Sequence, residues 1–206
     1  MKSATTIKQH GSIEPCCSVL IPVSNDVPGL RKLLSSLTRQ SRSATQFEVI
    51  VCDDGSTEPI RPSISEYQSA IPNLRCLRQD NLGQAAARNM GIIHSQSDVV
   101  IFLDSNIELD LNCIERLLQT LDENPSWSGA SARIVVQPNS SLPFGKKNES
   151  NGIEFNLAAI AYRVRDLRAV GGLDEHFRNS SRQGIDLARR ALLLGEIGRV
   201  SSAIAF

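Results

Sequence analysis

The sequence predicts an α/β domain whose central sheet is mostly parallel and is flanked by helices on both faces. Short apolar runs rich in β-branched residues alternate with segments long enough to form a helix. The second and fourth runs are continuously apolar, as parallel strands are when helices bury both of their faces. The runs lie at residues 18–23, 47–52, 74–77 and 98–103.

The order of elements in the first half follows from these runs. The first run ends in the polar turn Ser24-Asn25-Asp26, after which leucines recur at helical spacing, at positions 30, 33, 34 and 37. Small residues at 83–91 open a further helix, and the fourth run leads into a helix at Leu111. Parallel neighbours need such crossover helices, so strand-helix alternation predicts parallel pairing.

The second half is predicted to be a smaller region of mixed strands and helices. A loop rich in Pro, Asn, Ser and Lys covers 138–151, and a strand at 155–162 and a short helix at 165–170 follow it. An amphipathic helix at 185–194 ends at Gly195, where a last strand begins. We predict a tail at 1–15 and one domain at 16–206, with halves at 16–110 and 111–206.

Composition narrows the classes of function. With 41% hydrophobic residues among 206, the chain can bury a core, and its 22 basic and 22 acidic residues give no net field that favours nucleic acid. Five cysteines without regular spacing fit a reducing compartment. No run approaches the roughly 20 apolar residues of a membrane span. We therefore expect a cytoplasmic protein, with a peripheral position at the inner face of the membrane as an alternative.

Asp53 and Asp54 end a buried run and precede Gly55-Ser56. Ligands of parallel sheets bind beyond the carboxyl ends of the strands, which is where these carboxylates stand. Paired carboxylates repel unless a cation or a hydrogen-bond donor shares them, and a nucleobase N–H is such a donor. The alternative is a turn that only caps the strand and starts a helix.

Asp104 ends the fourth run in the same way, and Asn106 follows it. Oxygen ligands in this arrangement suit Mg²⁺ or Mn²⁺, which would neutralise a diphosphate leaving group. An Asx turn leading into the next helix is the alternative.

The segment 83–91 is rich in small residues and opens a helix, and Arg88 and Asn89 in it could donate to a phosphate or ribose. It lacks the spacing of a phosphate-binding loop. A helix whose alanines only pack against the sheet is the alternative.

Together these segments resemble the family 2 glycosyltransferases, whose fold is called GT-A. The resemblance rests on a strand that ends in Asp53-Asp54-Gly55-Ser56, on a Gly-x-x-x-Ala-Arg-Asn-x-Gly helix at 83–91 and on Leu103-Asp104-Ser105-Asn106. It extends to Gly171-Gly172-Leu173-Asp174-Glu175, which is similar to the family's acceptor-side segment. It implies an inverting transferase that moves a sugar from a nucleoside diphosphate sugar to a hydroxyl.

The resemblance implies that 16–110 is the nucleotide-binding half and 111–206 the acceptor-side half, and it implies roles for individual residues. Around the nucleotide it places six residues, namely Pro22, Asn25, Asp53, Asp54, Arg88 and Asp104. At the metal it places Asp104 and Asn106, although the family usually carries a second carboxylate at the latter position. Ser24 stands where an aromatic residue often stacks on the base.

A larger departure concerns the base that deprotonates the acceptor. The resemblance aligns the family's Glu-Asp-x-Asp-Leu segment with Gln183-Gly184-Ile185-Asp186-Leu187, so Gly184 replaces the basic carboxylate. Asp186 or Asp174 could take its place as the catalytic base. The alternative is a catalytically inactive domain that binds nucleotide sugars and partners another transferase.

The resemblance also suggests the partners of the reaction. They are a nucleoside diphosphate sugar as donor and a carbohydrate or lipid-linked acceptor, in polysaccharide or glycoconjugate assembly. A nucleotidyltransferase is a weaker alternative, because the loop at 24–29 lacks the expected Gly-rich, basic character.

Overall fold

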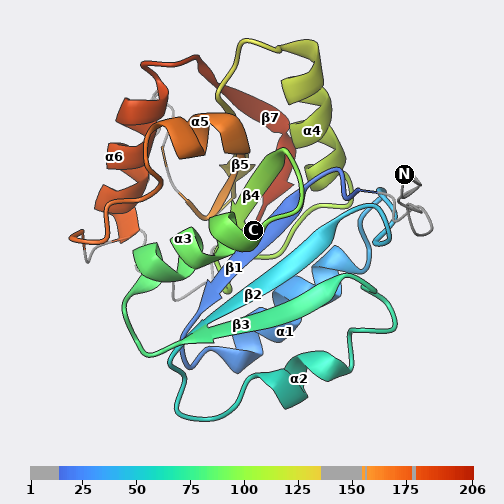
Figure 1. The fold of residues 1–206 in the computed structure, drawn as a ribbon. Coiled ribbons are helices and arrows are strands. Elements are labelled where there is room, and N and C mark those ends of the chain that lie inside the picture. The colour runs from blue at the N-terminus through green and yellow to red at the C-terminus, as the bar shows by residue number, and fades with distance from the viewer. Residues whose placement is uncertain (1–13, 136–154, 156, 178–179) are drawn as a thin grey trace, which may run out of the picture.

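Figure 1 shows the computed structural model of the chain, which describes residues 14–135, 155, 157–177 and 180–206. One seven-stranded sheet forms its centre, in the order β3-β2-β1-β4-β6-β5-β7. The strands are β1 (Ser18–Val23), β2 (Glu48–Asp54), β3 (Leu74–Gln79), β4 (Val99–Leu103), β5 (Gly129–Ile134), β6 (Ala159–Arg163) and β7 (Ile197–Ala205). The mixed α/β class and the helix-flanked sheet are confirmed.

The first four strands pair in parallel, as the alternation of strands and helices predicted. Strand β1 lies between β2 and β4, with Val23 opposite Asp53 on one side and Leu20 opposite Phe102 on the other. Strand β3 extends the sheet beyond β2. Because they run in the same direction, β1, β2, β3 and β4 all end at one edge, which we call the carboxyl edge; the opposite edge is the amino edge.

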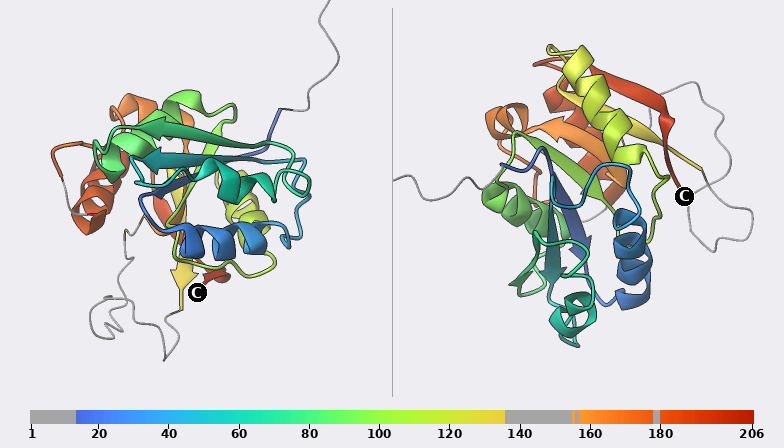
Figure 2. Two further views of the ribbon diagram at one scale, coloured as in Figure 1. Left: turned by 90° about the horizontal axis from the view of Figure 1, so that it is seen from below. Right: turned by 90° about the vertical axis from the view of Figure 1, so that its right-hand side faces the viewer.

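Helices cover both faces of the sheet. They are α1 (Val27–Leu37), α2 (Arg61–Ser65), α3 (Gln84–His94), α4 (Cys113–Glu123), α5 (Val164–Ala169) and α6 (Ser180–Ala191). Side chains alternate along a strand, so Val19 and Ile21 join one core with α1, α2 and α4. Leu20 joins the other core, with α3, α5 and α6. The left view of Figure 2 shows α1 and α3 on opposite sides of the sheet.

The second half departs from the prediction in three places. The strand expected at 155–162 is β6, which begins at Ala159 and runs antiparallel to β4. Strand β5 was not predicted, because Gly129 and the small residues after it form no apolar run. The reason is packing: a Cβ on Gly129 would lie 2.8 Å from the Ala161 carbonyl and 3.0 Å from the Tyr162 ring. The last helix ends at Ala191, three residues earlier than expected.

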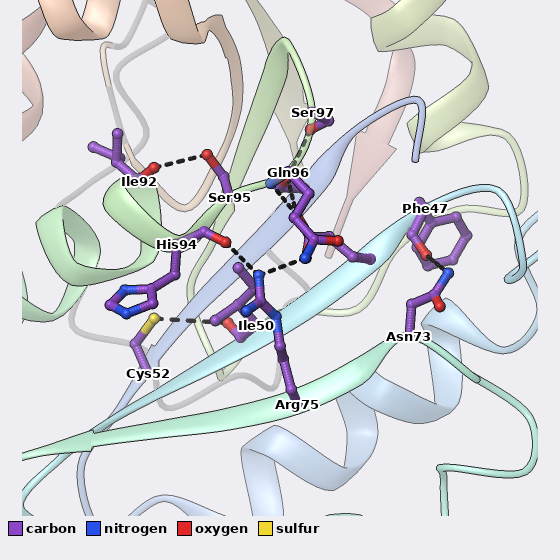
Figure 3. A network of polar contacts seen from close by, with 12 residues as sticks. Phe47, Ile50, Cys52, Asn73, Arg75, Ile92, His94, Ser95, Gln96 and Ser97 are labelled. Carbon is purple, nitrogen blue, oxygen red and sulfur yellow. Dashed lines mark hydrogen bonds and ion pairs between the residues drawn. The ribbon is translucent and has the colours of Figure 1, made fainter. Parts of the chain in front are cut away.

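A network of hydrogen bonds surrounds Glu48 at the amino edge. The Glu48 side chain is 3% exposed. Its Oε1 accepts from the Ser18 hydroxyl at 2.5 Å and from the Gln96 backbone N–H at 2.6 Å. Its Oε2 accepts from Arg75 at 2.8 Å. Figure 3 shows Arg75 and Gln96 within this network. Both oxygens of a buried carboxylate are therefore satisfied.

Two predicted segments, the tail and the loop at 138–151, lie largely or wholly outside the described residues. Within the described part of the chain, no helix is both long enough and apolar enough to span a bilayer.

Candidate nucleotide-binding site

The carboxyl edge gathers the polar residues that the sequence singled out. Asp53 and Asp54 end β2, Asn25 lies two residues after the end of β1, and Asp104 follows β4 directly. Because these strands are parallel neighbours, the residues lie at one edge of the sheet. Pro22, in β1, is buried beside them.

Asp53 holds the turn after β2. It is 2% exposed, and its Oδ1 accepts from the Ser56 backbone N–H at 2.9 Å, while its Oδ2 pairs with Arg78 at 2.5 Å. Gly55 has φ +70°, and a Cβ there would lie 2.6 Å from the Asn81 backbone nitrogen. Both carboxylate oxygens of Asp53 are therefore used within the fold, where they hold the turn and its link to β3.

Asp54 connects the end of β2 to the start of α3. It is 3% exposed, and both of its carboxylate oxygens accept from the Gly83 backbone N–H at 3.1 Å. Gln79 donates to the same carboxylate at 2.9 Å. A negative charge at a helix N-terminus is electrostatically favourable. The contact also fixes where α3 begins.

Asn25 ties the loop after β1 to the turn after β2. It adopts the left-handed region at φ 57°, which Asn tolerates better than most residues. Its backbone N–H donates to the Ser56 hydroxyl, and its side-chain oxygen accepts from the Thr57 N–H and hydroxyl, each at 2.9 Å. The two loops are thus held side by side.

Arg88 lies under the carboxyl edge and is fully buried. It donates to Asp104 Oδ1 at 2.6 Å, to Gln183 Oε1 at 3.1 Å and to Gln84 Oε1 at 3.4 Å. Burial lowers the pKa of the guanidinium, and the charge of Asp104 offsets part of that effect. Asp104 itself is 22% exposed, so the carboxylate is the member of the pair that faces outward.

Asn106, the other predicted metal ligand, is exposed beyond β4. Among the residues that the structure describes, no group of three or more His, Cys, Asp or Glu side chains is placed to hold a metal ion. Asp104 and Asn106 together offer carboxylate and amide oxygens near the end of one strand. Mg²⁺ is commonly held by one or two protein carboxylates with phosphates and water completing its shell, and this donor set fits such a role only in part.

Asn89, the neighbour of Arg88, contacts the acceptor-side segment and not the strand ends. Its side chain donates to the Leu173 carbonyl at 2.9 Å and to Glu175 at 2.8 Å, and accepts from the Leu173 N–H at 2.9 Å. A Cβ on Gly172 would lie 2.7 Å from its side-chain oxygen. Its hydrogen-bonding capacity is therefore used within the fold.

The two predicted bases differ in their surroundings. Asp186 pairs with Arg190, one helical turn away, and Arg190 donates to the carbonyls of Val170 and Gly172 at 2.6 and 2.8 Å. Asp174 has a 43% exposed side chain that accepts from the backbone N–H and ring of His176, both at 2.9 Å. Hydrogen bonds from His176 lower the pKa of Asp174. Asp174 is the less constrained of the two.

Gly184 is enclosed by the backbone of an adjacent segment. A Cβ at this position would lie 2.3 Å from the Phe155 carbonyl oxygen. The segment at Phe155 therefore lies where a side chain from residue 184 would extend. The Phe155 carbonyl occupies the space that a carboxylate side chain at position 184 would need, so the packing agrees with the glycine in the sequence.

Sequence reasoning missed three residues of this site: Arg78, Gln79 and Gln183. The first two lie opposite Asp53 and Asp54 in the parallel register of β2 and β3. Aligning the ends of neighbouring strands would have found them. Gln183 is buried and reaches Arg88 across 95 positions of sequence, so no local signal identifies it.

A helix-flanked sheet whose first four strands are parallel and carry acidic residues at their carboxyl ends is the arrangement in which α/β proteins bind ligands beyond the strand ends. The sequence matches the family model "Glycosyl transferase family 2" over residues 18–166. The chain belongs to this family of glycosyltransferases.

Known proteins extend this assignment. The chain is 32% identical over 196 residues to the pre-mycofactocin glycosyltransferase of Mycobacterium tuberculosis, covering 86% of this chain and 39% of that protein. It therefore spans about two fifths of that relative's length.

Solved structures show the same fold. S. aureus TarS 1–349 in complex with UDP-GlcNAc superposes with a TM-score of 0.75 at 20% identity, covering 91% of this chain and 57% of that one. The mannosyltransferase PcManGT from Pyrobaculum calidifontis, in complex with GDP-Man and Mn²⁺, gives 0.72 at 16% identity, covering 93% and 56%.

Proposed function

We propose that this chain binds a nucleoside diphosphate sugar at the carboxyl edge and transfers the sugar to a hydroxyl group with inversion. One observation carries the proposal: α3 links Asp54 to Asp104, through Gly83 at its start and Arg88 in its second turn. Family membership and structural neighbours solved with nucleotide sugars support it.

In this proposal the loops after β1 and β2 hold the nucleoside. Pro22, Asn25 and Asp54 surround the base and ribose, and Asp53 keeps its turn in shape through Ser56. Arg88 acts from beneath, by holding Asp104 at the edge. Uridine, guanosine and thymidine differ in the hydrogen-bond donors and acceptors of their bases. In this proposal the loops after β1 and β2 distinguish the nucleosides by contacting these groups.

We also propose that the site binds a divalent ion, Mg²⁺ or Mn²⁺. Asp104 and Asn106 would hold it together with the donor's diphosphate, and when bound it would neutralise the leaving group. The complex of PcManGT with Mn²⁺ supports this role in a protein of the same fold.

The acceptor hydroxyl needs a base on the opposite side of the sugar from the leaving group. We propose Asp174 as this base, since Asp186 is paired with Arg190 and shapes the Val170–Gly172 turn through it. Asp186 remains the second candidate. The proposed acceptor is a carbohydrate or a lipid-linked molecule in polysaccharide assembly. The proposed location is the cytoplasm, at the periphery of the membrane.

A second function, donor binding without transfer, is favoured by a specific observation. Gly184 replaces the basic carboxylate, and the Phe155 carbonyl closes the space beside it. In this alternative the domain binds nucleotide sugars and partners another transferase.

Two measurements test the proposal. Calorimetric titration with UDP, GDP and dTDP, with and without Mn²⁺, should show binding of at least one nucleotide; failure of all three would overturn it. Transfer or hydrolysis of the matching radiolabelled nucleotide sugar then separates the alternatives. Transfer that falls in Asp174→Asn and persists in Asp122→Asn, an exposed control on α4, supports catalysis. Binding without turnover supports the second function.

A further inference from the structure

Arg88 needs a negative partner because its guanidinium is fully buried. Its three hydrogen-bond partners are Asp104, Gln183 and Gln84, and only the first carries a charge. Its Nε is buried without a hydrogen-bond partner in the described structure. Asp104 therefore supplies the carboxylate that compensates this cation among the described residues.

Gln183 is the neutral member of this cluster. It is 2% exposed, accepts from Arg88 at 3.1 Å and donates through Nε2 to the Phe177 carbonyl at 2.7 Å. The segment that the sequence resembles carries glutamate at this position. A carboxylate there would give Arg88 a second negative partner, whereas the amide supplies a hydrogen bond without charge.

We propose that Gln183 sets the metal dependence of donor binding in this chain. By leaving Asp104 as the counter-ion of Arg88, it makes a divalent ion a weak and dispensable contributor to nucleoside diphosphate binding. A metal ion at Asp104 shares that carboxylate with a cation 2.6 Å away, and like charges oppose one another. The neighbouring candidate ligand, Asn106, is a neutral amide and attracts the ion less than a carboxylate does. The inference rests on the proposed function.

The quantity to measure is the Mn²⁺ enhancement, meaning the Kd for a nucleoside diphosphate in EDTA divided by the Kd in saturating Mn²⁺. We expect the wild-type enhancement to be below about fivefold, the lower end of ordinary coupling between ligands. Gln183→Glu should raise it about tenfold, because Arg88 gains its own carboxylate and Asp104 becomes available. Gln68→Glu adds the same charge on an exposed residue and should leave the enhancement unchanged.

A second variant covers the case in which Gln183→Glu fails to fold. Arg88→Gln removes the competing cation, so its Mn²⁺ enhancement should exceed that of the wild type, with folding checked by thermal unfolding. A fall in the enhancement would show that Arg88 orients Asp104 for a metal, which overturns the inference.

Two further outcomes are decisive. A wild-type enhancement of about a hundredfold or more, or no rise in a folded Gln183→Glu, would overturn the inference while leaving the proposed function intact. Failure of every nucleoside diphosphate to bind, with and without Mn²⁺, would overturn both.

Discussion

Two ion pairs, Glu48–Arg75 at the amino edge and Arg88–Asp104 at the carboxyl edge, differ in which member is buried. At the amino edge the Glu48 carboxylate is 3% exposed and its partner Arg75 is 35% exposed. At the carboxyl edge Arg88 is fully buried and its partner Asp104 is 22% exposed. The first arrangement encloses the carboxylate, and the second presents it to solvent. Only the second leaves an acidic oxygen where a ligand could meet it.

The hydrogen bonding of the two carboxylates reinforces this difference. The Glu48 carboxylate is buried and accepts from a hydroxyl, a backbone N–H and a guanidinium, so both of its oxygens are engaged within the fold. The bond from Arg88 to Asp104 falls on one oxygen, Oδ1. A structural ion pair and a ligand-facing one can therefore be distinguished by which partner is buried.

The largest expected effect is on stability at the amino edge. Glu48→Ala should lower the free energy of unfolding by about 3–5 kcal/mol, because it breaks a buried pair and leaves its donors unsatisfied. Denaturant unfolding measures this. Glu66→Ala is the control: its pair with Arg31 is more than half exposed, and the expected cost is below about 1 kcal/mol. Equal losses in the two variants would contradict the structural role of Glu48.

The next effect is on ligand affinity at the carboxyl edge. Asp54→Asn should weaken nucleoside diphosphate binding by more than about tenfold, because the charged carboxylate holds the Gly83 N–H at the start of α3 and a hydrogen bond to a charged group contributes about 1.5–3 kcal/mol. Glu48→Gln makes the same acid-to-amide change at the amino edge. Calorimetry should show an unchanged Kd for that variant, and an equal loss of affinity in both would contradict the distinction between the edges.

A third prediction concerns the residue that departs most from the family pattern. Gly184→Asp should lower the free energy of unfolding by about 1–3 kcal/mol, because its Cβ would overlap the Phe155 carbonyl. Gly184→Ala should show most of the same loss in a chemical denaturation curve. If Gly184→Asp were fully stable and gained transfer activity, Phe155 would have to move easily, and the packing explanation would be wrong.

The smallest expected effect is on the reactivity of the Cys16 thiol, which precedes β1 near the amino edge. A hydrogen bond from Cys17, with a further contribution from Arg42, lowers the pKa of Cys16 to about 6. Because the thiolate is the reactive form, alkylation of Cys16 by iodoacetamide should rise as pH passes upward through about 6 and then level off. Burial raises the pKa of Cys52 to about 12, so that thiol should stay unreactive. Mass spectrometry gives both rates, with Cys16→Ser as the control; a midpoint near 8.5 would contradict the assignment.

The sequence predicted the first half of the fold better than the second for a physical reason. Buried parallel strands are continuously apolar, and this pattern was clearest for β2 and β4, while shorter apolar runs located β1 and β3. Strand β5 begins with Gly129 because the Ala161 carbonyl and the Tyr162 ring occupy the space that a side chain there would need. That requirement comes from a partner more than 30 positions away and leaves no local signal.

For the site, the sequence predicted which residues lie at the strand ends but not what they contact. Asp54 and Asp104 were predicted from their place at strand ends, and the parallel pairing brings them to one edge. Their contacts were not predicted, because Gly83 reaches Asp54 over 29 positions and Arg88 reaches Asp104 over 16. The outward orientation of Asp104 depends on the burial of Arg88, which only the packed structure defines.

The most direct test of the account is an NMR titration of the ¹⁵N-labelled chain with UDP, GDP and dTDP. Binding at the carboxyl edge predicts that the amide signals of Asp54, Gly83 and Asp104 shift most, while those of Glu48 and Gln96 stay in place. Shifts centred on Glu48 and Gln96, or no shift with any of the three nucleotides, would contradict the assignment of the carboxyl edge as the nucleotide site.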